Sequence, residues 1–299
     1  MPRASANGIE IEYETHGDRG ARPLVLLRGL STQMIHWHPD LLRGLADRGH
    51  FVVVFDNRDV GCTTWFDDAG LPDLAAIAAG GEVSLAYGLD DMADDTVGLM
   101  DVLGLESAHV AGMSMGGMIV QAAAIRHPSR VRSMTSVMSS TGGAELPPPT
   151  PAALEALVTP GPEERAAYVE HTVRTQKVIS SPGFPFDTQR ESDVAARAYD
   201  RAFHPAGAAR QLAAVQSHGD RREALRKLEV PTLVIHGDGD PLIPLEHGRD
   251  TAATIPGARL HVIGGMGHDI PAGIHGEMIE AIGAHTEAAE SRDWNGGNR

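Results

Sequence analysis

The sequence predicts an α/β protein with a mostly parallel central sheet, flanked by helices and interrupted by an inserted helical segment. Short apolar runs alternate with helical patterns along most of the chain, which is the order that a parallel sheet covered on both faces requires. The runs 23–27 (PLVLL) and 51–55 (FVVVF) are continuously apolar, as expected of strands buried on both faces. The alternation stops between about 141 and 212, where the pattern is helical and polar.

Each expected element has its own signal. The strands expected in chain order are 9–13 (IEIEY), 23–27, 51–55, 108–113 (AHVAGM), 131–137 (VRSMTSV), 231–236 (PTLVIH) and 260–263 (LHVI). The first alternates, so one of its faces should be solvated. The helices expected between them are 39–48, with Leu at helical spacing, 89–103, with Asp90 and Asp91 at its start, 115–126, which is small and apolar, and 274–288, which is amphipathic.

The 299 residues suit one large domain with an insertion. We expect a core formed by 1–140 and 213–289, an inserted helical cap at 141–212 and a flexible, Gly-rich tail at 290–299. The cap begins with the Gly- and Pro-rich stretch STGGAELPPPTP. Its Pro-rich hinge and its size favour a lid over the carboxyl ends of the strands rather than a surface excursion without function.

Composition excludes several function classes. The net charge of −15 repels phosphate backbones and anionic lipids, so we expect neither nucleic acid nor membrane as a partner. The single cysteine, Cys62, cannot form an intrachain disulfide and is most often a packed hydrophobe in such a protein. The first residues lack the apolar segment of a signal peptide, and no apolar run reaches membrane-spanning length. These features predict a cytoplasmic protein, for which a homodimer is left open.

One serine stands in a pattern that suggests catalysis. Residues 110–121 read VAGMSMGGMIVQ and contain G-x-S-x-G around Ser114, between an expected strand and an expected helix. A serine on such a sharp turn needs small neighbours, which Gly112 and Gly116 supply, and the helix N-terminus favours negative charge beside its Oγ. The backbone N–H of Met115 is then the natural first oxyanion donor. The alternatives are a plain tight turn or a dinucleotide-binding glycine loop, but Ser114 occupies the place of the second glycine.

A nucleophilic serine needs a base and an acid on the same edge of the sheet. His268 follows the expected strand 260–263 on a Gly-rich loop, so it should lie at the carboxyl edge together with Ser114. His109 and His127 should lie at the opposite edge, and His275 is a distant second candidate. Asp238 and Asp240 both follow the expected strand 231–236, and the residues alone leave open which of them orients the histidine.

These motifs together resemble the α/β-hydrolase family over nearly the whole chain. GDGDPLIP matches the acid loop of the family through Gly237, Asp240 and Pro244, GMGHD matches its histidine loop, and FDNRDVGCTT resembles its D-x-R-G-x-G-x-S stretch, with Asp59 at a position usually held by glycine. The chain looks closest to bacterial esterases of the aclacinomycin methylesterase type. The resemblance favours Asp240 over Asp238 and gives the chain order Ser114, Asp240, His268.

The chain departs from the family where many members have His-Gly after the third strand. Here LLRGLS supplies Arg28 and Gly29, and the resemblance implies that the backbone N–H of Leu30 is the second oxyanion donor. We expect Arg28 to form a partly buried structural ion pair with Asp56 or Asp59. His36-Trp37-His38 lacks the second ligand pair of a metal site, so Trp37 should pack the loop beneath the oxyanion site.

The motifs predict a serine carboxylesterase that cleaves small to medium apolar esters through an acyl-enzyme on Ser114, without metal or cofactor. Flexible methionines near the motifs suggest a pocket wall, for which we name Met34, Met113 and Met266. Alternatives with the same triad are a cofactor-free haloperoxidase or perhydrolase and a lactonase. A binding protein with a relic triad is a third hypothesis. Haloalkane dehalogenases and epoxide hydrolases of this fold use an aspartate where Ser114 stands and are excluded.

Overall fold

The computed structural model describes residues 1–81 and 83–296, with side chains described up to Ser291. Its sheet has the strand order β1-β2-β4-β3-β5-β6-β7-β8. Only β2 pairs antiparallel, with β1 and with β4, whereas every pairing from β4 to β8 is parallel. The predicted mostly parallel α/β fold is therefore confirmed. The strands are β1 (Arg3–Ala6), β2 (Ile9–His16), β3 (Arg22–Leu27), β4 (His50–Phe55), β5 (Ala108–Met113), β6 (Val131–Val137), β7 (Thr232–Gly237) and β8 (Arg259–Ile263).

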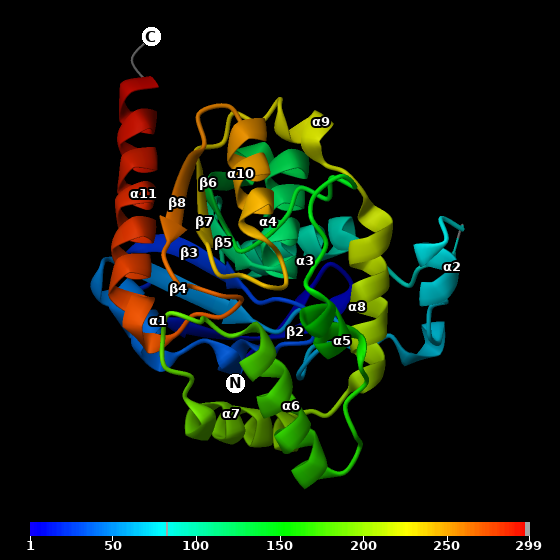
Figure 1. Cartoon of the computed structure of the whole chain (residues 1–299). Helices are drawn as coiled ribbons and strands as arrows, with labels where there is room; N and C mark the ends of the chain where they lie inside the picture. The colour runs from blue at the N-terminus through cyan, green and yellow to red at the C-terminus, as the bar shows by residue number, and fades with distance from the viewer. Residues whose placement is uncertain (82, 297–299) are drawn as a thin grey trace.

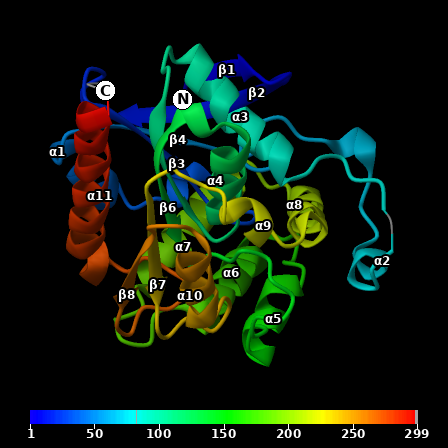
Figure 2. The same cartoon turned by 90° about the horizontal axis from the view of Figure 1, so that it is seen from above.

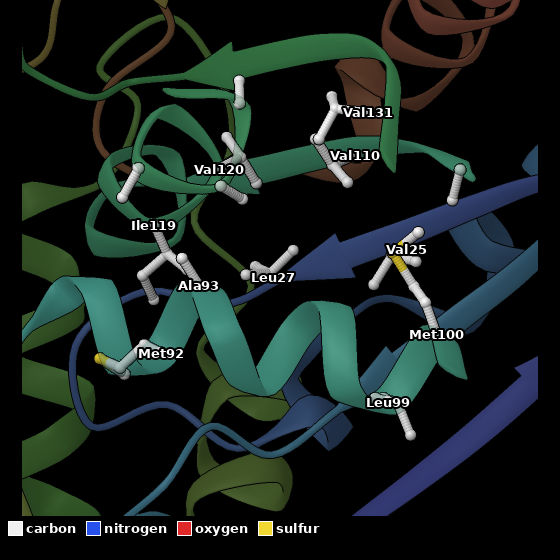
Figure 3. Packing of buried hydrophobic residues seen from close by; sticks show 14 of the residues in the cluster. Val25, Leu27, Met92, Ala93, Leu99, Met100, Val110, Ile119, Val120 and Val131 are labelled. Atoms are coloured by element: carbon white, nitrogen blue, oxygen red, sulfur yellow. The ribbon is translucent and has the colours of Figure 1, made fainter. Parts of the chain in front are cut away.

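Helices cover both faces of this sheet and bury a separate apolar layer on each (Figure 1). Along β3, Val25 and Leu27 join the layer under α3 (Leu89–Val102) and α4 (Met115–Arg126), which Figure 3 shows from close by. Leu24 and Leu26 point to the other layer, under α1 (Pro39–Asp47) and α11 (His275–Gly296). Because successive side chains of a strand face opposite sides, a continuously apolar strand serves both layers.

The four helices expected from periodicity are all present, with ends set by local chemistry. Pro39 occupies the first turn of α1, where its missing N–H costs nothing, and His38 Nδ1 accepts a 3.1 Å hydrogen bond from Asp40 N. The carboxylate of Asp91 accepts a 2.7 Å hydrogen bond from Gly88 N at the start of α3. α11 continues to Gly296, through most of the segment expected as a tail, and residues 297–299 lie outside the described residues.

Five helices separate β6 from β7, where an insertion was expected. They are α5 (Pro151–Val158), α6 (Arg165–Ile179), α7 (Thr188–Arg201), α8 (Pro205–His218) and α9 (Arg222–Leu225). α6 and α7 pack side by side at the bottom of Figure 1, and Figure 2 shows the same helices from above. The boundary that we expected at residue 212 falls within α8. Two further helices, α2 (Leu74–Ala78) and α10 (Leu245–Thr254), follow β4 and β7.

Buried ion pairs tie this helical segment to the sheet. Arg201, at the end of α7, contacts Asp56 Oδ2 at 2.6 Å and pairs with Glu12 of β2. Arg210 of α8 makes a two-pronged contact with Asp59, with N···O distances of 2.7 and 2.8 Å. These ion pairs thus anchor the helical segment to the acidic loop after β4. In the described part of the chain, no helix combines the length and apolarity needed to cross a membrane.

Candidate active site

Ser114 occupies a strained turn between β5 and α4. Its φ of 55° and ψ of −123° are rare for a residue with a side chain, and such strain is commonly found at functional sites. The neighbouring strand β6 and the residues after it hold the turn in place. Ser114 N donates a 2.9 Å hydrogen bond to Val137 O, and Ser139 Oγ donates a 2.8 Å hydrogen bond to Ser114 O. The backbone that carries Ser114 is therefore fixed by the sheet itself.

The glycines around Ser114 are required by contact distances. A Cβ added to Gly112 would lie 2.1 Å from Gly116 O, and one added to Gly116 would lie 2.4 Å from Leu27 O. A Cβ at Gly117 would lie 2.5 Å from Ser139 Cβ. Each distance is far below van der Waals contact, so the turn, β3 and α4 approach as closely as they do only because side chains are absent. Gly117 thus has the packing role that its position suggests.

His268 and Asp240 form a buried pair at the carboxyl ends of β7 and β8. His268 Nδ1 lies 2.7 Å from Asp240 Oδ2, and both side chains are almost fully buried. Asp240 Oδ1 accepts hydrogen bonds from Leu242 N and Ile243 N, each 2.9 Å long. Burial raises the pKa of Asp240, but the interactions with His268 and with the backbone N–H of Ile243 outweigh it and hold the pKa below its ordinary value. An ionised carboxylate oriented in this way fixes the imidazole with its proton on Nδ1.

The contact with Asp240 occupies Nδ1 of His268 and leaves Nε2 as its second ring nitrogen. Within residues 1–81 and 83–291 Nε2 has no hydrogen-bond partner, and neither has Ser114 Oγ. In unliganded enzymes the hydrogen bond between base and nucleophile is often long or poorly aligned and tightens when substrate binds.

The second carboxylate of the loop has a different environment. Asp238 is exposed, and its Oδ1 accepts a 2.6 Å hydrogen bond from Gly265 N, so it braces the loop that carries His268 without contacting the imidazole. His236 lies 3.8 Å from Asp240 Oδ2, but its Nε2 is 2.8 Å from Ile243 O, and burial lowers its pKa. Sequence reasoning did not single out His236, because a histidine inside a strand pattern carries no functional signal.

The helical segment holds the histidine loop directly. His268 N donates a 2.8 Å hydrogen bond to Ile179 O, the last residue of α6. Gly267 N donates to Ser181 Oγ at 2.8 Å, and Ser181 N donates to Asp269 Oδ1 at 2.8 Å, while Ser181 Oγ also donates to Asp269. This clamp could not be predicted from the sequence, because it joins residues more than 80 positions apart.

Two backbone N–H groups are available near Ser114. In the described part of the chain, neither the N–H of Leu30 nor that of Met115 donates a hydrogen bond to another residue. Gly29 lies between Leu30 and the strand β3, and a Cβ added to it would be 3.1 Å from Ser114 Cβ. The loop after β3 therefore passes directly beside the serine, where an oxyanion would need its second donor.

The three methionines named for the pocket are all buried. Met34, Met113 and Met266 are each at most 5% exposed and belong to the same apolar layer, together with Trp37. Their role as a pocket wall stays a prediction. A surface hollow between His38 and α7 is lined by none of these methionines and by none of Ser114, Asp240 and His268.

The expected ion pair of Arg28 is wrong. Asp56 is bound by Arg201 and Asp59 by Arg210, and in the described residues no carboxylate pairs with Arg28. The guanidinium instead lies over the ring of Trp37, 4.9 Å from its centroid. Both carboxylates form ion pairs with arginines of the helical segment instead. The local sequence around Arg28 contains no signal for these distant partners.

The remaining candidates lie away from this pair. His109 is fully buried at the start of β5 with its Nδ1 2.8 Å from Ser133 Oγ, and burial lowers its pKa to about 3. His127 contacts Asp94, and the ring of His275 contacts that of His38. Cys62 is half-buried against Arg201 O, and burial raises its pKa, so it is not an activated thiolate.

Comparison with known proteins agrees with this geometry. The family model described as alpha/beta hydrolase fold matches residues 22–271. The chain is 29% identical to rhodomycin D methylesterase DauP of Streptomyces sp. strain C5, over 94% of this chain and 96% of that protein. It is 28% identical to rhodomycin D methylesterase DnrP of Streptomyces peucetius, over 97% of this chain and 99% of the relative.

A solved structure shares the fold at lower identity. The meta-cleavage product hydrolase CumD of Pseudomonas fluorescens IP01 superposes with a TM-score of 0.75 at 20% identity, covering 97% of this chain and 98% of that one. With the family model spanning residues 22–271, the chain belongs to the alpha/beta hydrolase fold family.

Proposed function

We propose that the chain is a serine carboxylesterase that cleaves small to medium apolar carboxylic esters through an acyl-enzyme on Ser114. One observation carries this proposal: the buried Asp240–His268 pair, 2.7 Å apart, lies at the same sheet edge as the strained turn of Ser114. The methylesterase names of the two Streptomyces relatives support an ester as substrate.

The proposed reaction uses side chains and backbone alone. Ser114 Oγ attacks the ester carbonyl while His268 Nε2 takes its proton, and Asp240 stabilises the imidazolium that results. The oxyanion receives hydrogen bonds from Leu30 N and Met115 N, each worth about 10²–10³ in rate by analogy with other oxyanion holes. The alcohol leaves with the proton from His268. Water then attacks the acyl-enzyme by the same steps and frees Ser114.

The helical segment 141–212 acts as a cap in this proposal. Its contact with His268 through Ile179 O, and the 2.8 Å hydrogen bond from Ser31 N to Gln211 Oε1, place it against both the base loop and the oxyanion loop. A cap in this place can exclude water while the acyl-enzyme forms. Met34, Met113 and Met266, which are buried in one apolar layer with Trp37, would supply the flexible apolar wall of the pocket.

The test is a panel of p-nitrophenyl esters from acetate to palmitate. We expect activity on short to medium chains, and a loss of at least about 10³-fold in kcat for Ser114→Ala. Ser129→Ala is the matched control, since Ser129 is exposed on the short helix Pro128–Arg130. Full activity in Ser114→Ala overturns the mechanism. Halogenation of monochlorodimedone, measured in parallel, detects a perhydrolase activity if ester hydrolysis is absent.

A further inference from the structure

Arg28 lies one residue from the backbone that touches Ser114. It follows β3 directly, and a Cβ added to the next residue, Gly29, would be 3.5 Å from Ser114 Oγ. The carbonyl of Arg28 accepts a 3.1 Å hydrogen bond from Asn57 Nδ2, which fixes its backbone beside the loop after β4. The guanidinium is therefore anchored to the same short loop that is proposed to supply the second oxyanion donor.

No protein group satisfies this guanidinium. Within the described residues, none of its N–H groups has a hydrogen-bond acceptor, its Nε is buried, and no carboxylate lies within 4.0 Å. Another arginine of the chain shows the usual arrangement. Arg221 is only 5% exposed and donates to Gln121 Oε1, Ser140 O and Gly219 O. Buried polar groups are nearly always paired, so the lack of acceptors around Arg28 needs an explanation.

The surroundings of Arg28 do not cancel its charge. Burial lowers its pKa to about 10, and Arg190 of α7 adds to this effect. Glu191 acts in the opposite direction, but its carboxylate is paired with Arg190. His36 is neutral near pH 7, because burial and then the charge of Arg28 lower its pKa to about 3. Arg28 is thus left without a carboxylate of its own to offset its charge.

The Arg28 side chain keeps accessible surface near the His268 loop. Arg28 and His36 are both intermediate in exposure rather than fully buried. Glu191 is near enough to influence the pKa values of both Arg28 and Asp269, the neighbour of His268. Trp37 covers one face of the guanidinium and leaves its N–H edge for a planar acceptor.

We propose that Arg28 binds a carboxylate of the substrate, so that the site prefers esters carrying a second, ionised carboxyl group, such as monoesters of dicarboxylic acids. This rests on the proposed esterase function and adds its substrate class. A carboxylate matches the two-pronged donor edge of a guanidinium. It also brings one negative charge to this one unpaired guanidinium.

The kinetic test compares monomethyl glutarate with its neutral analogue, dimethyl glutarate. Native protein should favour the monoester, and in Arg28→Gln the ratio of the two kcat/KM values should fall by about 10–100-fold, as expected for a lost hydrogen-bonded charge. Arg165→Gln is the matched control. It removes the same charge from an exposed pair with Asp200 and should keep the native ratio. An unchanged ratio in Arg28→Gln contradicts the proposal.

A binding test separates this proposal from the proposed function. Ser114→Ala protein is titrated with glutarate in a calorimeter, with malonate, succinate and adipate as length variants and inorganic phosphate as competitor. Binding that disappears in Ser114→Ala/Arg28→Gln supports a carboxylate site even if the native protein hydrolyses no ester. Tighter binding of phosphate than of any dicarboxylate overturns the choice of carboxylate, and failure of all of these anions to bind overturns the site.

A urea unfolding measurement tests whether the guanidinium of Arg28 has a structural partner in the folded protein. Arg28 has no partner among the described residues, so Arg28→Met, which keeps the packing on Trp37, should raise the urea midpoint of unfolding. A lower midpoint would mean that the guanidinium has a structural partner, and would overturn the proposal.

Discussion

The backbone N–H of His268 donates a 2.8 Å hydrogen bond to the carbonyl of Ile179, so the proposed base is held by the last residue of a cap helix. Two further contacts repeat this connection. Gly267 N donates to Ser181 Oγ, and Gly183 N donates a 2.9 Å hydrogen bond to Gly265 O. Any movement of the segment 179–183 therefore moves the histidine loop as well.

Ser181 is expected to act as a positioning residue for His268. In Ser181→Ala, Gly267 N loses its acceptor and Asp269 loses a donor, which should lower kcat by about tenfold and stability by ~1–3 kcal/mol. Ser180→Ala is the control, because Ser180 Oγ donates only to Lys177 O. The measurement is kcat and KM of both variants on a p-nitrophenyl ester. Equal kcat values in the two variants would remove Ser181 from this role.

Substitution of Asp240 should lower kcat far more than substitution of Asp238. Asp240→Asn presents an amide to His268 Nδ1 and favours the wrong tautomer, so kcat should fall by about 10³–10⁴-fold. Asp238→Asn keeps an oxygen that can accept from Gly265 N, so kcat should change by less than about threefold. Steady-state kinetics at neutral pH measure both. The reverse result would assign the orienting role to Asp238.

Asp240 and Asp269 should have opposite effects on the pH dependence of stability. The pKa of Asp240 is lowered, so the ionised group stabilises the fold at neutral pH, and this contribution is lost as pH falls through the lowered pKa. The destabilisation by Asp240→Asn should therefore shrink between pH 7 and pH 3. Burial raises the pKa of Asp269, so ionisation there costs stability at neutral pH and the cost disappears in acid. The destabilisation by Asp269→Asn should accordingly grow as pH falls. Urea unfolding of both variants and native protein across this range is the measurement.

Gly112 should not tolerate even one methyl group. In Gly112→Ala the new Cβ would meet Gly116 O at 2.1 Å, which should cost about 3 kcal/mol or more and displace Ser114. Gly276→Ala is the control within the same protein. Nothing lies within 4 Å of its added Cβ, and Gly276 lies in α11, so stability should rise by up to ~1 kcal/mol. Chemical unfolding of both variants tests this, and a neutral Gly112→Ala would disprove the close packing of the turn.

Arg201 should be the strongest single link between cap and sheet. Burial raises the pKa of the fully buried Asp56 and Arg201 counteracts this effect, so Arg201→Met leaves the carboxyl group buried without its cation and should cost ~3–5 kcal/mol. Arg165→Met removes an exposed pair with Asp200 and should cost about 0–1 kcal/mol. Thermal and urea unfolding measure the difference. Similar costs for the two variants would mean that Asp56 finds another partner.

Much of the fold and of the site could be predicted because the evidence for them is local. Ser114, Asp240 and His268 each follow an apolar run, and such runs in a parallel sheet end at the same edge. The choice of Asp240 over Asp238 depended on family resemblance, since the spacing along one loop does not show which carboxylate turns inward.

The remaining features depend on contacts between distant parts of the chain. Arg28 lost its expected partners to Arg201 and Arg210, which are more than 170 positions away. The clamp of Ser181 on the histidine loop has the same origin. β1 was missed because RASA carries no apolar run, and its pairing with β2 alone makes it a strand. Periodicity reports what a segment can do by itself, and these features exist only after the chain has folded.

The strained turn of Ser114 is held from within the sheet, by Val137 O and Ser139 Oγ, whereas the loop of His268 is held by the cap. The two halves of the proposed catalytic pair therefore have different local stabilities. The helices α5 and α6 share only a small cluster of buried apolar residues, compared with the large cluster under the sheet. They should therefore open first under mild denaturant. Activity should then disappear at lower urea concentrations than most of the far-ultraviolet circular dichroism signal. It should return on dilution, because the turn that carries Ser114 stays folded.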